Sequence, residues 1–338
     1  MVVFSITLGF DSTEYIKSTK FNDLKVYYSL EEVPEIKNPV ITLGTYDGVH
    51  QGHQQIIDFL TKSAKKINGE TVLFTFHPHP RMVLHPDDHN LELIQDIDRR
   101  IECLADSGID HLILFPFTKD FSRISATEFV RNILVNALNV KLLTIGYNHH
   151  FGRNREGNIE LLRELAPVYN FEVEEIPAFR LDELSVSSTK IRKALKSGDI
   201  KTANQYLGRP FRFKGEVVHG DQLGTKIGFP TANIGNVVDY QIIPGNGVFA
   251  VKVKLDGSIF EGMLNIGTRP TVTNSTERRL EVHLFDFNED IYGKEVELFL
   301  LDRIREEKTF LSIDDLKTQL QKDEVNSRRI IDRNTVRL

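Results

Sequence analysis

Residues 40–53 read Val-Ile-Thr-Leu-Gly-Thr-Tyr-Asp-Gly-Val-His-Gln-Gly-His, an apolar run followed at once by glycines and histidines. An amphipathic stretch that predicts a helix continues to about residue 67. Free amides and the helix dipole favour anions where a strand enters a helix N-terminus, and glycines let a ligand approach the backbone closely. The stretch therefore predicts a phosphate site whose candidate residues are Gly44, Tyr46, Asp47, His50, Gly52 and His53.

Short apolar runs alternate with longer amphipathic ones around this stretch, from Pro39 to Ile176. The alternation predicts a Rossmann-like α/β domain with a parallel sheet and crossover helices. The expected strands are Val40–Leu43, Thr71–Phe76, His111–Phe115, Lys141–Ile145 and Phe171–Ile176. The expected helices are near 53–67, 96–107, 126–138 and 158–168, and Ser125 and Glu128 predict a capping box at the start of the third.

A different pattern begins after a helical stretch near 188–206 that is interrupted by Gly198. Strand-like runs follow, and Asp256-Gly257 between two of them predicts a two-residue hairpin. The runs are 247–254, 259–264, 280–285 and 296–301, with a closing helix expected at 312–321. We therefore expect an α/β plus β protein with a small antiparallel β-barrel and a terminal helix, divided into domains 22–206 and 207–338.

Bulk composition narrows the class of protein. The chain has 338 residues, of which 40% are hydrophobic and 27% charged, as in soluble globular proteins. Its formal net charge of −6 offers no global attraction to nucleic acid or anionic lipid, so we expect neither as a partner. No membrane-spanning run or secretion signal is visible, which predicts a cytoplasmic protein. The single cysteine, Cys103, has apolar neighbours and is expected at a buried helix position. The sequence leaves open whether the protein forms a homo-oligomer.

The two histidines of the opening stretch are three residues apart, so their rings lie on one side of a helical turn. They could hold a phosphate chain or a metal ion, or belong to a solvated helix start. The segment His50–His53 resembles the His-x-Gly-His signature of the nucleotidyltransferase superfamily. That signature also fits class I aminoacyl-tRNA synthetases, pantetheine-phosphate adenylyltransferases and cytidylyltransferases.

Three further segments resemble the FAD synthetase domain of prokaryotic bifunctional riboflavin kinase/FAD synthetases. The resemblance implies that the segment 75–80 lines the flavin side of the site, through Phe76, Pro78 and Pro80. Asn148 belongs to the second segment, 146–158, where many family members have Asp, with a Phe-Arg pair at positions 149 and 150. In the third, 186–192, the resemblance implies that Arg192 and the hydroxyl residues hold the leaving pyrophosphate, the latter being Ser187, Ser188 and Thr189.

The implied reaction is an in-line attack of the FMN phosphate on the α-phosphorus of ATP, without a covalent enzyme intermediate. Catalysis would rest on positioning and charge stabilisation by His50, His53, Arg192, backbone amides and Mg²⁺.

A second glycine-rich stretch lies in the β half, at residues 220–233. It is not a Walker P-loop, because no Gly-Lys-Ser/Thr opens a helix. Its glycines could still wrap phosphates with backbone amides, and its hydroxyl and amide oxygens suit Mg²⁺ on a nucleotide. The candidate residues are Gly220, Gly224, Lys226 and Gly228 for phosphate, and Thr231 and Asn233 for both nucleotide and metal.

Gly228–Asn233 resembles the Pro-Thr-Ala-Asn signature of riboflavin kinases, and the resemblance continues through 247–250, 265–271, 281–286, 292–293 and 305–310. It implies a kinase that phosphorylates riboflavin to FMN with ATP as co-substrate. It also implies that Glu281 is the general base for the riboflavin 5′-hydroxyl.

Three alternatives stay open from the sequence. The chain could keep only one of the two activities, and the departure from the family at positions 148–150 makes the first half the one that could have lost its activity. The chain could bind flavin as a regulator or carrier without turnover. A class I synthetase is the third reading, because Ser187–Lys190 faintly resembles that family's second signature.

Overall fold

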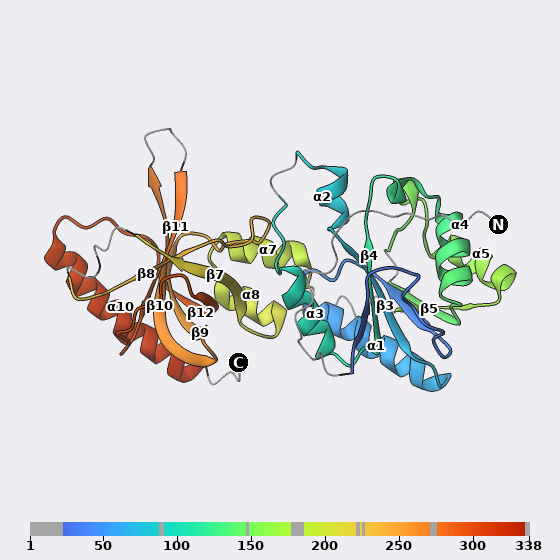
Figure 1. The fold of residues 1–338 in the computed structure, drawn as a ribbon, viewed down its shortest axis with the longest axis horizontal. Helices are drawn as coiled ribbons and strands as arrows, with labels where there is room; N and C mark the ends of the chain where they lie inside the picture. The colour runs from blue at the N-terminus through green and yellow to red at the C-terminus, as the bar shows by residue number, and fades with distance from the viewer. Residues whose placement is uncertain are drawn as a thin grey trace.

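The computed structural model describes residues 23–87, 91–146, 149–176, 186–220, 224, 227–270 and 276–334. Figure 1 shows two bodies, a β-sheet with helices and a β-barrel, with helices α7 and α8 lying between them. The expected order of a parallel half followed by an antiparallel half is therefore confirmed, and the fold is α/β plus β.

The N-terminal body is a six-stranded sheet in the order β1-β4-β3-β2-β5-β6, and every neighbouring pair is parallel. Its strands are β1 Lys25–Tyr27, β2 Val40–Leu43, β3 Thr71–His77, β4 His111–Pro116, β5 Leu142–Gly146 and β6 Glu172–Ile176. The helices are α1 Gln51–Lys66, α2 Pro80–Leu84, α3 Ile97–Ala105, α4 Ala126–Phe129 continued by the π-helical turn Val130–Ala137, and α5 Ile159–Tyr169.

The strand order places β2 at a topological switch point, because β3 and β4 lie on one side of it and β5 and β6 on the other. Open parallel sheets bind ligands at the carboxyl ends of the strands at such a point. The glycine and histidine stretch begins directly after β2, so it lies at the edge of the sheet where a ligand is expected.

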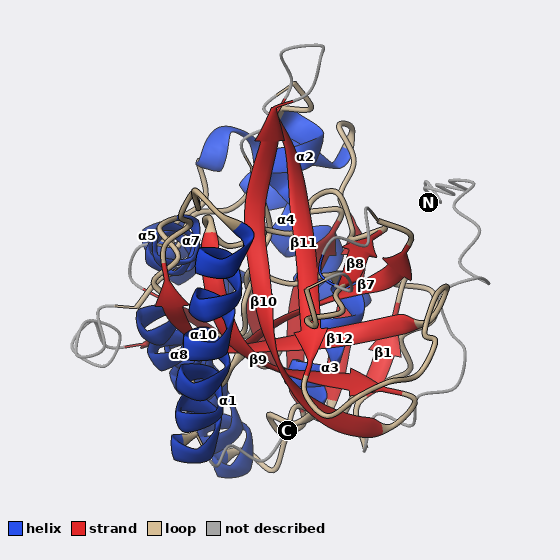
Figure 2. Ribbon diagram, turned by 90° about the vertical axis from the view of Figure 1, so that its left-hand side faces the viewer, coloured by secondary structure: helices blue, strands red, loops and turns tan. Residues whose placement is uncertain are grey.

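The C-terminal body is a closed six-stranded barrel in the order β10-β11-β8-β7-β12-β9. Its strands are β7 Phe211–Val218, β8 Ala232–Gly235, β9 Gly247–Leu255, β10 Ser258–Pro270, β11 Thr276–Leu284 and β12 Glu295–Arg305. Buried and partly exposed residues alternate along β7, as expected where one face of a strand fills a barrel. The helix α10, Ile313–Arg333, lies along the outside of the barrel (Figure 2).

Helices α7 (Ser188–Lys196) and α8 (Ile200–Leu207) share their apolar core with the barrel. Ile191, Leu195 and Ala203 belong to the same buried cluster as Phe211 and Phe249. The domain limit that the sequence suggested, after residue 206, stays a prediction.

Several local predictions are confirmed. The hairpin at Asp256-Gly257 joins β9 to β10, and both turn residues have positive φ, 49° and 84°. The capping box of Ser125 and Glu128 is present, Cys103 is buried in α3, and Gly198 separates α7 from α8 with φ 74°.

The closing helix was predicted too short, because it continues from residue 321 to Arg333. The continuation is strongly charged, and two of its buried positions are polar. Asp323 pairs with Arg305 (Oδ2 to Nε, 2.8 Å), and the Ser327 hydroxyl donates to the Gly262 carbonyl (2.9 Å). Polar residues at buried positions interrupt the hydrophobic periodicity of the helix, so the periodicity predicted a helix end near residue 321.

Candidate active sites

The stretch after β2 forms the first candidate site, at the switch point of the sheet. Tyr46 is buried, and its hydroxyl is 3.1 Å from the Thr42 hydroxyl. Gly44 lies under the Tyr46 ring, where a Cβ would approach the ring to 2.8 Å. Tyr46, Gly48 and Val49 all have positive φ, at 49°, 87° and 35°, so this loop is held in backbone conformations that non-glycine residues rarely adopt.

The histidine pair sits at the start of α1. His50 is the N-cap residue, and its Nδ1 accepts the backbone N–H of His53 at 3.2 Å. The two rings stack with centroids 3.6 Å apart, and the Tyr46 ring is 4.8 Å from that of His53. Because Nδ1 of His50 is an acceptor, the neutral ring carries its proton on Nε2. His50 can therefore donate from Nε2 to an anion at the helix N-terminus.

Both rings are held neutral. Burial and the Arg209 guanidinium lower the pKa of His50 to about 4. Burial, together with the charges of His50 and Arg209, holds the pKa of His53 well below its usual value. The pair therefore offers hydrogen bonds rather than positive charge near neutral pH, and cationic groups must come from elsewhere.

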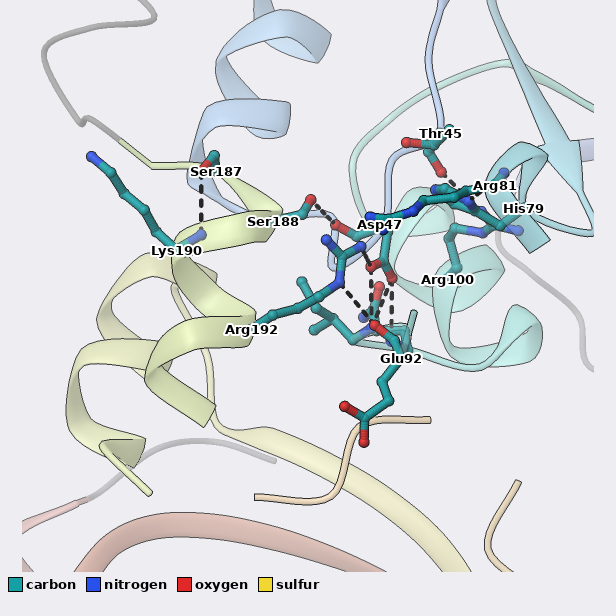
Figure 3. A network of polar contacts seen from close by, with 12 residues as sticks. Thr45, Asp47, His79, Arg81, Glu92, Arg100, Ser187, Ser188, Lys190 and Arg192 are labelled. Carbon is teal, nitrogen blue, oxygen red and sulfur yellow. Dashed lines mark hydrogen bonds and ion pairs between the residues drawn. The ribbon is translucent and has the colours of Figure 1, made fainter. Parts of the chain in front are cut away.

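Asp47 ties the loop to α7, as Figure 3 shows. Its carboxylate is 2.6 Å from Nη2 of Arg192 and accepts the backbone N–H of Ile94 at 3.0 Å. Burial raises the pKa of Asp47, and the Arg192 charge opposes that shift. The Ser188 hydroxyl donates to the Asp47 carbonyl at 2.9 Å. The segment 186–192, distant in sequence, is thus brought directly against the phosphate loop.

The expected residues of α7 differ in their surroundings. Ser187 is the N-cap and accepts the Lys190 amide at 3.3 Å, whereas Thr189 is exposed. Arg192 was expected to hold a leaving pyrophosphate. Its Nε donates to the Glu92 carbonyl at 2.8 Å and its Nη2 to Asp47, so at least two of its donors serve the protein itself. A Cβ on Gly52 would come within 3.2 Å of the His50 ring and 3.6 Å of the Val186 carbonyl oxygen, so there is little room for a larger residue here.

Arg100 is a buried cation of this site that the sequence pattern did not single out. It donates to the Thr45 carbonyl at 2.8 Å and to the Phe76 carbonyl at 3.2 Å, which joins the ends of β2 and β3. Burial lowers the pKa of Arg100, and the Asp47 charge opposes that shift. A lone arginine inside a helix carries no motif, so only the fold reveals its position.

The flavin-side segment lies at the end of β3. Phe76 packs edge-on against Phe117, with centroids 5.4 Å apart, and at a tilt against Phe121, 5.7 Å away. Pro78 follows a cis peptide bond and Pro80 is the first residue of α2. Aromatic faces of this kind suit a planar ring ligand. The candidate Asn148 lies outside the described residues.

The second candidate site lies on the outer face of the barrel. Glu281 of β11 is directly opposite Asn233 of β8 and, on its other side, Asn265 of β10. The Arg279 guanidinium is 3.7 Å from Glu281. Direct cross-strand partners point to the same face with Cβ atoms about 5 Å apart. The carboxylate is therefore flanked by two amide side chains, and Asn265 was not among the predicted site residues.

Glycines lie beside the three polar side chains of Asn233, Glu281 and Asn265. A Cβ on Gly220 would come within 1.9 Å of the Asn233 amide nitrogen, and one on Gly224 within 3.1 Å of the Thr231 hydroxyl. The Gly224 carbonyl accepts the amides of Ile227 and Phe229, and Gly228 has φ 87°. Gly220 and Gly224 therefore lie close to the side chains of Asn233 and Thr231, respectively. Lys226 lies outside the described residues.

Comparison with known proteins follows the same division. Residues 33–190 match the FAD synthetase family and residues 207–331 the riboflavin kinase family. The chain is 40% identical to the bifunctional riboflavin kinase/FMN adenylyltransferase of Buchnera aphidicola, over 85% of this chain and 92% of that protein.

The chain belongs to the bifunctional riboflavin kinase/FMN adenylyltransferase family. A second member of this family, from Haemophilus influenzae, is 41% identical over 84% of the chain and 91% of that protein. A solved structure titled macrolide-efflux protein from Streptococcus pneumoniae shares the fold, with a TM-score of 0.81 and 33% identity. That match covers 91% of this chain and 99% of the other. None of the helices in the described part of the chain combines the length with the apolar sequence that a membrane span requires.

Proposed function

We propose that the two halves of this bifunctional family member act in sequence on one flavin. The C-terminal half phosphorylates riboflavin to FMN with ATP, and the N-terminal half transfers the adenylyl group of a second ATP to FMN, which gives FAD and pyrophosphate. Family membership over most of the chain supports both activities. We assign them to residues 207–338 and 22–206, respectively.

In the N-terminal half we propose that loop 44–53 and the start of α7 bind the phosphates of ATP. An oxygen of the FMN phosphate attacks the α-phosphorus, and the bond from that phosphorus to the leaving pyrophosphate breaks. His50 and His53 donate hydrogen bonds to the phosphoryl oxygens as neutral rings, and the α1 amides add the helix dipole. Arg100 and Arg192 supply the positive charge near the loop, while Asp47 fixes the position of Arg192.

The ring of FMN is assigned to the aromatic side of this site, against Phe76 and beside Pro78 and Pro80. The cluster of Phe76, Phe117 and Phe121 lies at the carboxyl end of β3, next to the loop that holds the phosphates. Asn148 keeps its assignment from the sequence as a further flavin-side residue.

In the C-terminal half we propose Glu281 as the general base. The riboflavin 5′-oxygen attacks the γ-phosphorus of ATP, its proton passes to the Glu281 carboxylate, and ADP leaves. The observation that carries this assignment is the placement of Glu281 directly opposite Asn233, beside the loop of Gly220 and Gly224. Base and nucleotide-binding residues thus share one face of the barrel.

The residues of the second site fit Mg²⁺. Thr231 and Asn233 are two positions apart at the start of β8 and offer a hydroxyl and an amide oxygen on one face. Mg²⁺ prefers oxygen ligands and keeps several waters and substrate phosphates, so two protein oxygens are enough for a shared site. When bound there, the ion would neutralise charge on the transferred phosphoryl group.

Other parts of the proposal rest on the sequence. We assign a cytoplasmic location, because the sequence shows no membrane-spanning run or secretion signal. We expect no nucleic-acid partner, because the net charge of −6 offers no general attraction to nucleic acid. We also assign phosphate binding to Lys226 and Gly228.

The experiment is a crossed assay of two variants in the full chain. Glu281→Gln is expected to lower FMN formation from riboflavin by about 10²- to 10⁴-fold, while FAD formation from supplied FMN persists. His53→Ala is expected to lower FAD formation by about 10²- to 10³-fold and to spare FMN formation. Glu261→Gln, on the neighbouring strand β10, is the matched control. Loss of both activities in either variant would break the two-site assignment.

The same assay separates the alternatives. A flavin-binding regulator would bind riboflavin without consuming ATP, whereas a chain with one degenerate half would lack one activity before any substitution is made.

A further inference from the structure

Arg209 reaches from the riboflavin kinase half into the phosphate loop of the other half. It lies between the end of α8 at Leu207 and the start of β7, within the region that matches riboflavin kinases. Its Nη1 donates to the Val49 carbonyl at 3.0 Å, and its Nη2 to the Gly48 carbonyl at 2.5 Å. These are the two residues directly before His50.

The two carbonyls belong to the most constrained part of the loop. Gly48 has φ 87° and Val49 φ 35°, and Val49 is fully buried. A β-branched residue with positive φ is strained, and this conformation persists only where the surroundings hold it. The Arg209 guanidinium is one such restraint, because its planar fork bonds both carbonyls at once.

The restraint acts on the groups that face the phosphates. A trans peptide places its N–H opposite its C=O, so a fixed Val49 carbonyl also fixes the direction of the His50 N–H. His50 is the N-cap of α1 and stacks on His53. The position of Arg209 therefore affects how the histidine pair and the N-terminus of α1 are oriented toward bound phosphates.

The two halves stay joined by other contacts. Arg212 of β7 pairs with Glu102 of α3 at 2.6 Å and with Glu297 of β12 at 2.8 Å. The Leu93 amide donates to the Tyr240 carbonyl at 2.6 Å, and its carbonyl accepts the Ile242 amide at 2.8 Å. Removal of the Arg209 guanidinium therefore leaves this seam in place.

We propose that Arg209 is a positioning residue for adenylyl transfer, supplied by the riboflavin kinase half to the phosphate loop of the FAD synthetase half. The proposal rests on the assignment of loop 44–53 as the site of that reaction. It makes FAD formation depend on a residue outside the matched region 33–190. It also explains why arginine stands there, since a lysine ammonium is a point charge that lacks the planar fork.

The test compares three variants of the full chain. Arg209→Gln is expected to lower kcat/KM for FAD formation from FMN by about 10- to 100-fold, because the loop shifts from its reactive geometry. FMN formation by the same molecule is expected to be unchanged. Arg209→Lys should recover only part of the loss. Arg212→Gln, which removes an arginine from the same seam without touching the loop, should show no selective loss of FAD formation.

A second readout reports on the loop itself. The charged groups acting on His50 are Arg209 and Arg192, and those acting on His53 are His50, Arg209 and Arg100. Nuclear magnetic resonance titration of both rings is expected to show higher pKa values in Arg209→Gln than in Arg212→Gln.

Three outcomes would overturn the proposal. They are unimpaired FAD formation in Arg209→Gln, equal selective losses in the Arg209 and Arg212 variants, and loss of both activities in both Arg209 variants. The last would make the arginine a determinant of the fold. Absence of FAD formation in the unsubstituted protein would instead remove the function proposed for loop 44–53.

Discussion

Glu281 and Asn233 are direct cross-strand partners on β11 and β8. The proposed base for riboflavin and a proposed ligand of the nucleotide metal therefore project from one face of the barrel. Asn265 of β10 is the partner of Glu281 on the other side, which completes a row of three polar side chains across three strands. The reaction that joins a hydroxyl to a phosphate needs these groups side by side, and the register of the barrel supplies that arrangement.

Gly220→Ala tests this arrangement without removing a functional group. The added Cβ would come within 1.9 Å of the Asn233 amide nitrogen, so the amide must turn away. We expect FMN formation to fall by about 10- to 100-fold, because a misplaced ligand costs this much in rate. Rates at several Mg²⁺ concentrations should show a raised Mg²⁺ requirement, with FAD formation from FMN as the internal control. Wild-type FMN kinetics would show that the Asn233 amide is not needed where it lies.

The buried pair of Asp47 and Arg192 is expected to contribute to stability as well as to catalysis. Their side chains are 2% and 19% exposed, and removal of one partner of a buried pair costs about 3 to 5 kcal/mol. We expect a loss of this size in the free energy of urea unfolding for Arg192→Gln. The double variant Asp47→Asn/Arg192→Gln should recover much of it.

FAD formation separates the two roles of Arg192. If the guanidinium also contacts the phosphates, the double variant regains stability while FAD formation stays low. Full recovery of FAD formation with stability would limit Arg192 to holding Asp47.

Acid is expected to destabilise the N-terminal half through its buried and partly buried histidines. Burial lowers the pKa of four rings to about 4, those of His50, His77, His79 and His149, and it holds the pKa of His53 well below its usual value. In the unfolded chain a histidine titrates near about 6.5, so the unfolded state binds more protons between these values. The stability is therefore fully present above about pH 6.5 and is lost as the pH falls through about 4.

Urea unfolding across this pH range measures the effect. His149→Asn should reduce the slope of unfolding free energy against pH, because one of the contributing rings is gone. A slope that is flat in the unsubstituted protein, with these rings titrating near about 6.5, would contradict the expectation.

Much of the architecture follows from the sequence, because its elements have strong local patterns. The runs at 40–43 and 71–76 consist of apolar residues and threonines, as is typical of buried parallel strands, and they are strands in the structure. The strands β1, β7 and β8 and the helix α2 were missed. β1, β8 and α2 have three to five residues, too few for a periodicity to be seen, whereas β7 has eight residues that include Gly215 and three charged side chains.

The site residues also differ in how far the sequence reveals them. Motif residues such as His50, His53 and Asn233 are recognisable because several chemically informative residues stand close together. Arg100 and Arg209 carry no such local signal, and Asn265, although it opens the segment 265–271 that resembles riboflavin kinases, was not singled out as a site residue. Their positions depend on strand register and on the seam between the two halves, which only the fold brings together.

The central claim is that one chain converts riboflavin to FMN and then FMN to FAD. The most direct measurement is to incubate the purified protein with riboflavin, ATP and Mg²⁺ and to separate the flavins by chromatography over time. We predict that FMN appears first and that FAD follows as FMN is consumed. Accumulation of FMN without any FAD, or the absence of both products, would contradict the account.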